Sequence, residues 1–166
     1  YVNCLYEDTD GSIWIGTDRG GVSILDPYQM KIRSWKTHSG SLSGLSSDRV
    51  TGICKDQKGY YWISTLGGGL NRMDYIKGTF IHFRASEKET SISNDNIVNM
   101  IRSYDGQLYL ATRNGLTIFN PVTHKVRRVF LDDKGNDADN RMQYVYEDPS
   151  GNIYVATFKK GLYIYI

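Results

Sequence analysis

Arginine, lysine and asparagine side chains stand at recurring positions where this chain could bind a charged ligand. Some come directly before a short apolar segment, and the others follow a threonine that recurs along the chain. A guanidinium group can grip both oxygens of a carboxylate or sulfate, so arginine suits this chemistry best. We therefore expect ligand-binding residues at Arg19, Arg49, Asn96, Arg113, Asn114, Arg141, Lys159 and Lys160.

The simpler alternative is a solvated loop surface that carries unrelated charges. The chain has 20 Lys+Arg against 18 Asp+Glu, a formal net charge of +2. One segment near the candidates holds Asp132, Asp133, Asp137 and Asp139, which dilute a positive field and slightly favour this alternative. No dense Lys/Arg stripe is present, so we expect no nucleic acid partner and no general attraction to an acidic membrane.

The histidines and aspartates do not follow a metal-binding pattern. His38, His82 and His124 are far apart in the sequence, none three to five residues from another, so they indicate neither a zinc site nor a catalytic base. Residues 8–11 (Asp-Thr-Asp-Gly) look like the start of a calcium loop, but no Glu stands at its far end. We expect surface histidines, no metal and no cofactor.

Two other functional motifs are incomplete. Residues 67–69 are all glycine, but neither a helix signal nor Lys-Ser/Thr follows them, as a phosphate-binding loop requires. Residues 39–44 (Ser-Gly-Ser-Leu-Ser-Gly) do not form the Gly-x-Ser-x-Gly turn of a serine hydrolase. Cys4 and Cys54 lie in apolar runs, which predicts small buried thiols and no disulfide. We expect no catalytic residues and a chain that is not an enzyme.

A fourfold internal repeat determines the expected fold. The phrase 11–17 (Gly-Ser-Ile-Trp-Ile-Gly-Thr) aligns with 59–65, 106–112 and 151–157, and its threonines are 48, 47 and 45 residues apart. This is the period of propeller blades, and apolar residues alternate or form short β-branched and aromatic blocks without a helical stripe. Thirteen Tyr and seventeen Gly beside three Pro agree with many short strands and tight turns.

Each repeat supplies strand candidates in the same order. The first lies at 2–8, 50–56, 97–103 and 142–148, the second ends at the threonine, and the third begins after a glycine. Outer strands are expected at 31–35, 79–83 and 125–130. We predict an all-β chain of four-stranded antiparallel β-propeller blades, about half a propeller, with three full blades and a three-stranded fourth. In this single partial propeller the blades lie at about 1–36, 49–83, 97–130 and 141–166.

The repeated residues have structural roles in this interpretation. A broad aromatic side chain fills the wedge between blades and a small residue lets neighbouring sheets approach, so Trp14 and Trp62 are expected to be buried and Gly16 to lie at a close contact. Asp8, Asp56 and Asp148 are expected to hydrogen-bond turn amides, three residues before a glycine with positive φ. The loop positions do not repeat in identity, which leaves them free for recognition.

The repeat resembles the two-component regulator propeller repeat. The resemblance rests on Glu7-Asp8, Asp10-Gly11, residues 13–17 (Ile-Trp-Ile-Gly-Thr) and Gly20-Gly21, and it continues through residues 61–74 of the second copy. The phrases at 44–48 and 91–95 belong to it as well. The third and fourth copies depart from the pattern, with Tyr for Trp and Ala for Gly.

This resemblance implies the periplasmic sensor part of hybrid two-component regulators in Bacteroidetes-type bacteria, many of which sense glycan breakdown products. The expected role is non-catalytic recognition of an oligosaccharide or another small ligand. Any membrane attachment would come from parts of a longer protein that this chain does not include. Two alternatives stay open: a scaffold that binds a protein partner, and a lyase-like carbohydrate-active or streptogramin-lyase-like enzyme.

Open blade faces predict self-association. The chain is expected to be excised from a longer protein, and a partial propeller leaves an apolar face at its first blade and both a face and a strand edge at its last. We therefore expect the isolated chain to form a dimer.

Overall fold

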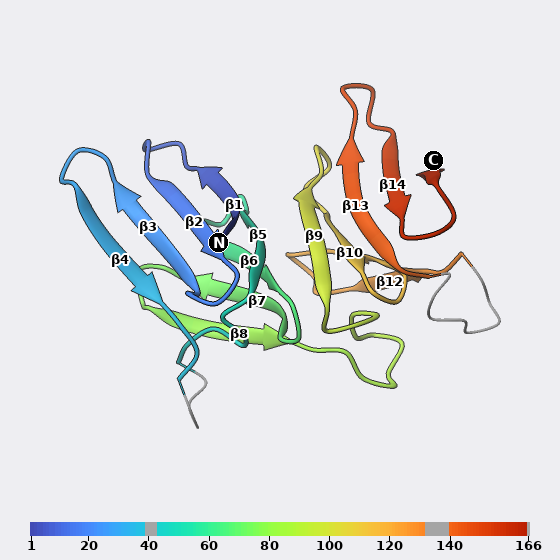
Figure 1. Cartoon of the computed structure of the whole chain (residues 1–166), viewed down its shortest axis with the longest axis horizontal. Helices are drawn as coiled ribbons and strands as arrows, with labels where there is room; N and C mark the ends of the chain where they lie inside the picture. Colours follow the sequence, from blue (N-terminus) through green and yellow to red (C-terminus); the bar gives the residue numbers. More distant parts are fainter. Residues whose placement is uncertain (39–42, 132–139, 166) are drawn as a thin grey trace. The chain divides into compact units, whose positions relative to one another are not determined.

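The computed structural model of the chain describes residues 1–38, 43–131 and 140–165. Within these ranges the regular elements are fifteen β-strands, which form four antiparallel sheets (Figure 1). The chain divides into two compact units, residues 1–82 and 83–166. No helix in the described ranges is long and apolar enough to cross a membrane.

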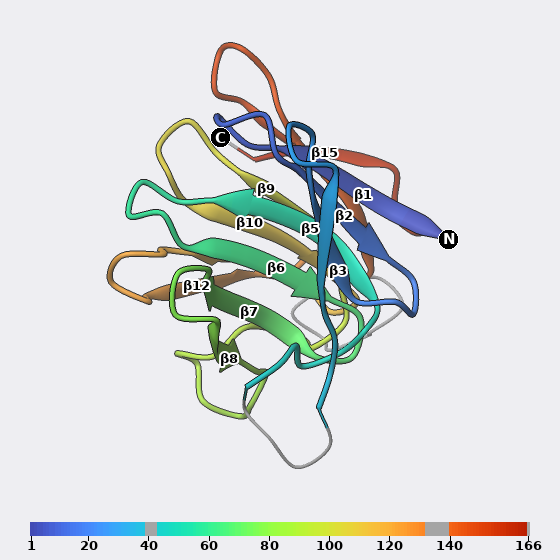
Figure 2. The same cartoon turned by 90° about the vertical axis from the view of Figure 1, so that its left-hand side faces the viewer.

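The first unit contains two four-stranded sheets. Strands follow one another in each sheet in chain order, β1-β2-β3-β4 (Figure 1) and β5-β6-β7-β8 (Figure 2). The strand bounds are β1 (Val2–Glu7), β2 (Ile13–Thr17), β3 (Val22–Asp26), β4 (Lys31–Trp35), β5 (Val50–Lys55), β6 (Tyr61–Thr65), β7 (Gly69–Asp74) and β8 (Thr79–Phe83).

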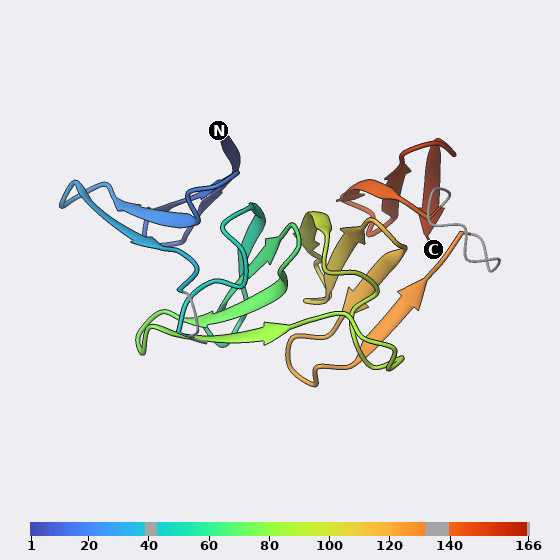
Figure 3. The ribbon, with the colours of Figure 1, turned by 60° about the horizontal axis from the view of Figure 1, so that its bottom comes forward.

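The second unit contains one four-stranded and one three-stranded sheet. They are the yellow-to-orange and the red sheets of Figure 3, with strand orders β9-β10-β11-β12 and β13-β14-β15. The strand bounds are β9 (Ile97–Arg102), β10 (Leu108–Thr112), β11 (Leu116–Phe119), β12 (Val126–Val129), β13 (Met142–Glu147), β14 (Ile153–Thr157) and β15 (Leu162–Tyr165). The predicted pattern of three four-stranded sheets and a three-stranded fourth is confirmed.

The inner strand of every sheet ends one residue before its predicted end. The next residue, Asp8, Asp56, Ser103 or Asp148, instead starts a turn, because its carbonyl accepts the amide of the turn glycine three residues later. Those glycines have φ between +81° and +87°, as predicted. Each inner strand also carries a bulge after its first residue.

An aromatic core joins the two sheets of the first unit. Trp14 from β2 is fully buried, and its ring centroid lies 4.1 Å from that of Tyr61 in the neighbouring sheet. Gly16 lies where a Cβ atom would come within 2.6 Å of Val50 Cγ1, so the predicted close approach of the sheets is confirmed. Trp62 is also fully buried, as predicted.

The second unit repeats this arrangement with smaller side chains. Tyr109 and Ala111 from β10 take the places of Trp14 and Gly16, and they pack against Val145 and Val155 of the adjoining sheet. These side chains are buried. The repeated small and aromatic residues therefore form the contact between consecutive blades in both units.

Candidate functional site

A repeated pair of backbone positions carries the candidate ligand residues of each blade. We call the residue before each inner strand the start position (Tyr1, Arg49, Asn96, Arg141) and the residue after each repeated threonine the turn position (Asp18, Leu66, Arg113, Phe158). In all four blades the amide of the turn position donates to the carbonyl of the start position, at 2.9–3.0 Å. The backbone is therefore the same at each pair, whereas the side chains differ.

The repeated threonine keeps this loop closed. Thr17, Thr65, Thr112 and Thr157 each donate from Oγ1 to the carbonyl of the glycine at the start of the third strand or just before it, at 2.7–3.0 Å. In three blades the same Oγ1 also accepts a loop amide. This role was missed in the sequence interpretation, although an identical residue in all four copies was a signal for it.

In the first unit the predicted arginines are engaged by an aspartate. Arg49 donates from Nε to Asp18 Oδ1 at 3.1 Å, and Arg19 Nε lies 3.8 Å from Asp18 Oδ2. Asp18 was not among the predicted site residues. It partly neutralises the positive charge expected here, so Arg49 is less suited to an external anion than the sequence implied.

The second unit holds the remaining predicted residues. The side chains of Arg113, Arg141, Lys159 and Lys160 are exposed, while Asn96 and Asn114 are half-buried. The Arg141 guanidinium lies 5.7 Å from the ring centroid of Phe158, an exposed aromatic that sequence reasoning did not single out. The loop aspartates Asp132, Asp133, Asp137 and Asp139, which were expected to dilute this charge, lie outside the described residues.

Outer-strand side chains hold one loop between blades in each unit. Arg128 of β12 donates from Nε to the Ser91 carbonyl at 2.8 Å and from its guanidinium to the carbonyls of Ser86 and Lys88. His82 of β8 donates from Nε2 to the Gly44 carbonyl at 2.9 Å. These residues position loops, and the His82 ring is half-buried rather than on the open surface as expected.

A buried polar cluster near the turn of the first blade has a structural role. The Asp8 side chain is fully buried, accepts a hydrogen bond from Tyr61 and pairs with Lys55 Nζ at 2.7 Å. Burial raises the pKa of Asp8, but the bonds from Lys55, Tyr61 and the Thr9 amide outweigh it, so this pKa lies below its usual value. Burial and the Asp8 carboxylate raise the pKa of Tyr61.

The other turn aspartates behave as the sequence predicted. Asp56 Oδ1 accepts the amides of Lys58 and Tyr60, while its Oδ2 accepts the Trp62 indole N–H at 2.8 Å. Asp148 caps its turn in the same way, through the amides of Ser150 and Asn152. Asp8 differs, because within its turn Oδ1 bonds only Thr9, accepting from its amide and its hydroxyl, and the second oxygen is directed into the next blade.

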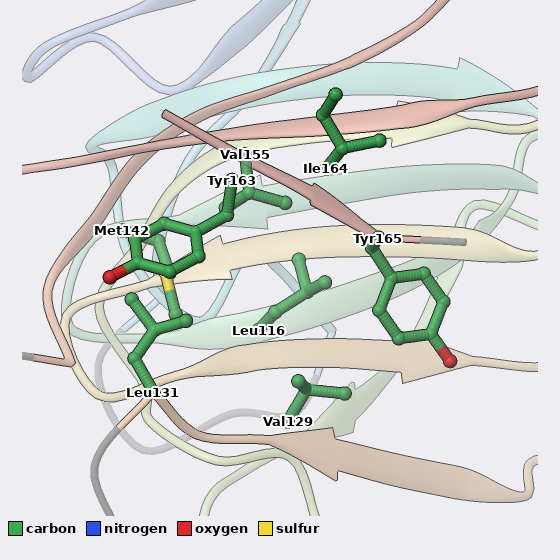
Figure 4. Close-up of a pocket in the computed structure, with 8 residues that line it drawn as sticks. All are labelled: Leu116, Val129, Leu131, Met142, Val155, Tyr163, Ile164 and Tyr165. Carbon is green, nitrogen blue, oxygen red and sulfur yellow. The ribbon is translucent and has the colours of Figure 1, made fainter. Parts of the chain in front are cut away.

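An apolar pocket of about 100 Å³ lies between the two sheets of the second unit (Figure 4). Leu116 and Val129 line one side, and Val155, Tyr163 and Tyr165 line the other. At the position of Val129 the first unit has Trp35, which stacks on Trp14. The pocket is therefore present because a smaller side chain packs at this position in the second unit. Among the described residues, the two tyrosines are the only polar side chains that line it, and none of the lining side chains is charged.

The described residues also bear on the other chemical motifs. They contain no group of His, Cys, Asp and Glu that could hold a metal. A Cβ atom on Gly68 would collide with Ser46, so this glycine allows close packing against a loop. Cys54 is buried as predicted, whereas Cys4 is half-buried, and neither forms a disulfide. Burial raises the pKa of the Cys4 thiol to about 11.

Comparison with known proteins identifies the repeat. Residues 1–19 and 44–67 match the two component regulator propeller family. The chain also superposes on the extracellular domains of two proteins described as hybrid two component systems of B. thetaiotaomicron, BT3049 (22% identity, TM-score 0.81) and BT4673 (23%, 0.78). In both cases the match covers 99% of this chain and 22% of the other, so the chain spans about a fifth of their length. No curated protein matches the chain significantly.

A more distant likeness concerns an enzyme. Virginiamycin B lyase from Staphylococcus aureus has 12% identity to the chain and a TM-score of 0.67, over 99% of this chain and 55% of the lyase. At this identity the likeness shows the fold alone.

The class of protein follows from these observations: the four sheets are β-propeller blades. Residues 1–19 and 44–67, in the first two blades, match the two-component regulator propeller repeat, which confirms the predicted resemblance over these residues.

Proposed function

We propose that this chain is a non-catalytic recognition segment of an extracytoplasmic sensor propeller in a hybrid two-component regulator, and that it senses glycan breakdown products in the periplasm. The observation that carries the proposal is the pair of start and turn positions that recurs in each blade. The same backbone hydrogen bond supports four different side-chain pairs, so these side chains can vary without a change of fold. The regulator repeat and the likeness to extracellular domains support the sensor context.

A binding screen with a turnover control tests this proposal. The chain is titrated calorimetrically with neutral and acidic oligosaccharides, and each mixture is then analysed by chromatography for new products. Saturable binding with intact oligosaccharide is the expected result. Product formation that a point substitution abolishes would instead establish the lyase-like alternative, and the absence of any saturable ligand would contradict the sensing role.

A second candidate function is protein interaction, which we propose takes the form of association with another copy of this chain. Leu5 in β1 is 67% exposed, whereas Ile53, at the same place in the second blade, is buried against the first blade. The last sheet exposes Tyr146, Leu162 and Ile164, at the places where the first blade has Tyr6, Val22 and Ile24 packed in its core. Two copies can therefore repeat the packing seen between the first two blades.

Light scattering after size exclusion at low micromolar concentration tests this association. We expect a dimer, and Leu5→Lys is expected to shift it to monomer because the charge faces the apolar sheet. Lys31→Glu, on the exposed outer strand of the same blade, is the matched control. A stable monomer of the unsubstituted chain would exclude the self-association.

A further inference from the structure

The start position of one blade lies beside the turn position of the blade before it. In the first unit an ion pair demonstrates this, because Arg49 at a start position donates to Asp18 at the preceding turn position, with Nε and Oδ1 3.1 Å apart. The inner strands β1 and β5 pack side by side around it. An arginine and a carboxylate thus meet at this place between consecutive blades.

The second unit has the same backbone arrangement. Arg113 and Phe158 at the turn positions donate their amides to the carbonyls of Asn96 and Arg141, as Asp18 and Leu66 do in the first unit. Strands β9 and β13 pack side by side as β1 and β5 do, and Val145 N donates to Asn99 across them at 3.0 Å. The positions of Asp18 and Arg49 therefore correspond to those of Arg113 and Arg141.

The second unit consequently has two arginines where the first has an aspartate and an arginine. Both side chains are exposed, and neither forms a salt bridge with an acidic side chain of the described ranges. Two neighbouring guanidinium groups repel each other, and an anion between them relieves the repulsion and accepts charge-assisted hydrogen bonds. The first unit supplies the anion itself, through the Asp18 carboxylate, whereas the described part of the second unit has no carboxylate paired with Arg113 or Arg141.

We infer that Arg113 and Arg141 bind the carboxylate of an acidic sugar, at the place that corresponds to the Asp18 carboxylate in the first unit. Phe158 supports a sugar rather than a bare anion as the ligand. Its ring is 53% exposed and lies next to the Arg141 guanidinium, where it offers an apolar surface against which a pyranose ring can pack. The ligand class is therefore a uronate or an oligosaccharide that ends in one, and the sugar part of this inference rests on the proposed sensing function.

Two probes that differ in one group test the inference directly. Arginine side-chain NMR signals of the whole chain are followed while galacturonate or galactose is added. Galacturonate is expected to shift the signals of Arg113 and Arg141 saturably, whereas galactose leaves them in place. Equal responses to the two sugars would overturn the carboxylate assignment.

Two substitutions that give each unit the charge found at the corresponding position of the other unit provide the matched variants. Arg113→Asp recreates the pair that Asp18 makes with Arg49, so it is expected to weaken galacturonate binding at least tenfold while the melting temperature stays the same or rises. Asp18→Arg is expected to create a second galacturonate site in the first unit. Unchanged affinity in Arg113→Asp at an unchanged melting temperature would contradict the site.

The contribution of the ring is separated by another pair of measurements. Phe158→Ala is expected to weaken galacturonate at least threefold and to leave the weak binding of acetate unchanged. If acetate and galacturonate both bind through the arginines but no oligosaccharide binds the chain, the anion site stands and the proposed sensing function fails.

The acidic segment at 132–139 supplies a further control, because its four aspartates precede Arg141 in the sequence. A variant with Asp132, Asp133, Asp137 and Asp139 all changed to Asn is expected to bind galacturonate within threefold of the unsubstituted chain. Binding that occurs only in this variant would show that the chain fills its own site and would overturn the inference.

Discussion

The residue that follows the inner strand makes a different polar contact in each unit. In the first unit it is Asp8, which contacts a cation in the next blade, whereas in the second unit it is the neutral Ser103, which contacts an acid. Asp8 pairs with Lys55, and Ser103 donates from Oγ to Glu147 Oε1 at 2.8 Å, with the Tyr104 amide on the other Glu147 oxygen. Lys55 and Glu147 occupy the same position of the repeat. The backbone is thus repeated, and the polar contact between blades is specific to each unit.

The aromatic contacts differ in the same way. The first unit surrounds Trp14 with Trp35, Tyr61 and Tyr75, whereas Tyr109 in the second unit has Tyr165 as its aromatic neighbour, at 6.5 Å. The apolar pocket lies in this more sparsely filled interface. The comparison indicates that the first unit depends more strongly on single buried side chains.

The largest expected effect separates the two aromatic cores. Trp14→Ala is expected to destabilise the chain by about 3–5 kcal/mol, because it leaves a large cavity among tightly packed rings. Tyr109→Ala is expected to cost less, about 2–3 kcal/mol, since its interface already contains a cavity and can relax. Denaturant melts of both variants measure the difference. A loss below about 1 kcal/mol for Trp14→Ala would contradict the packing described for Trp14.

A second pair of substitutions compares the polar contacts. Lys55→Met is expected to cost about 2–3 kcal/mol, because it leaves the buried Asp8 carboxylate without its cation. Glu147→Gln is expected to cost about 1 kcal/mol, since the amide oxygen still accepts one bond and the site is only half-buried. Thermal melts at neutral pH provide the measurement. Equal losses would mean that the two contacts are equivalent after all.

The pH dependence of stability is expected to report on the Asp8 contact of the first unit. The pKa of Asp8 is lowered in the folded chain, so its contribution is fully present above the unfolded value of about 3.9 and is lost as the pH falls through the folded value. Asp8→Asn is therefore expected to flatten the acid limb of the stability profile. Urea midpoints measured from pH 6 downward test this, and parallel profiles for both proteins would contradict it.

The smallest expected effect concerns the threonine loop closure. Thr65 is buried and Thr157 is not, so Thr65→Val is expected to cost about 1 kcal/mol and Thr157→Val a few tenths, through the loss of the same hydrogen bond in different environments. Chemical denaturation with repeated measurements resolves the difference. If Thr157→Val cost as much as Thr65→Val, burial would not govern the strength of this bond.

The sequence predicted the fold well because its period and turn glycines repeat. Strand number and order follow from the four copies of one phrase, and the burial of Trp14 and Trp62 follows from their place within it. The inner strands end early because the residue expected as their last, such as Asp8, forms the turn bond instead. Such one-residue differences depend on hydrogen bonding that composition does not reveal.

The candidate site was predicted less completely. Its positions on the repeat were found, but Arg49 and Arg141 were treated as equivalent, and the structure separates them through Asp18. The contacts of Asp8 with Lys55 and of Arg128 with the loop at 86–92 join residues about 36 to 47 apart in sequence. Partners at this distance become visible only when neighbouring blades are placed together, so single-repeat reasoning missed them.

The threonine loop closure has a consequence for how this chain can evolve. Because Oγ1 and the backbone bond between the paired positions hold each loop, the side chains at those positions contribute little to folding and are open to substitution. A duplicated blade can therefore acquire a new specificity by one or two point mutations while its scaffold is inherited intact. Related chains should accordingly diverge fastest at the start and turn positions and slowest at the threonine.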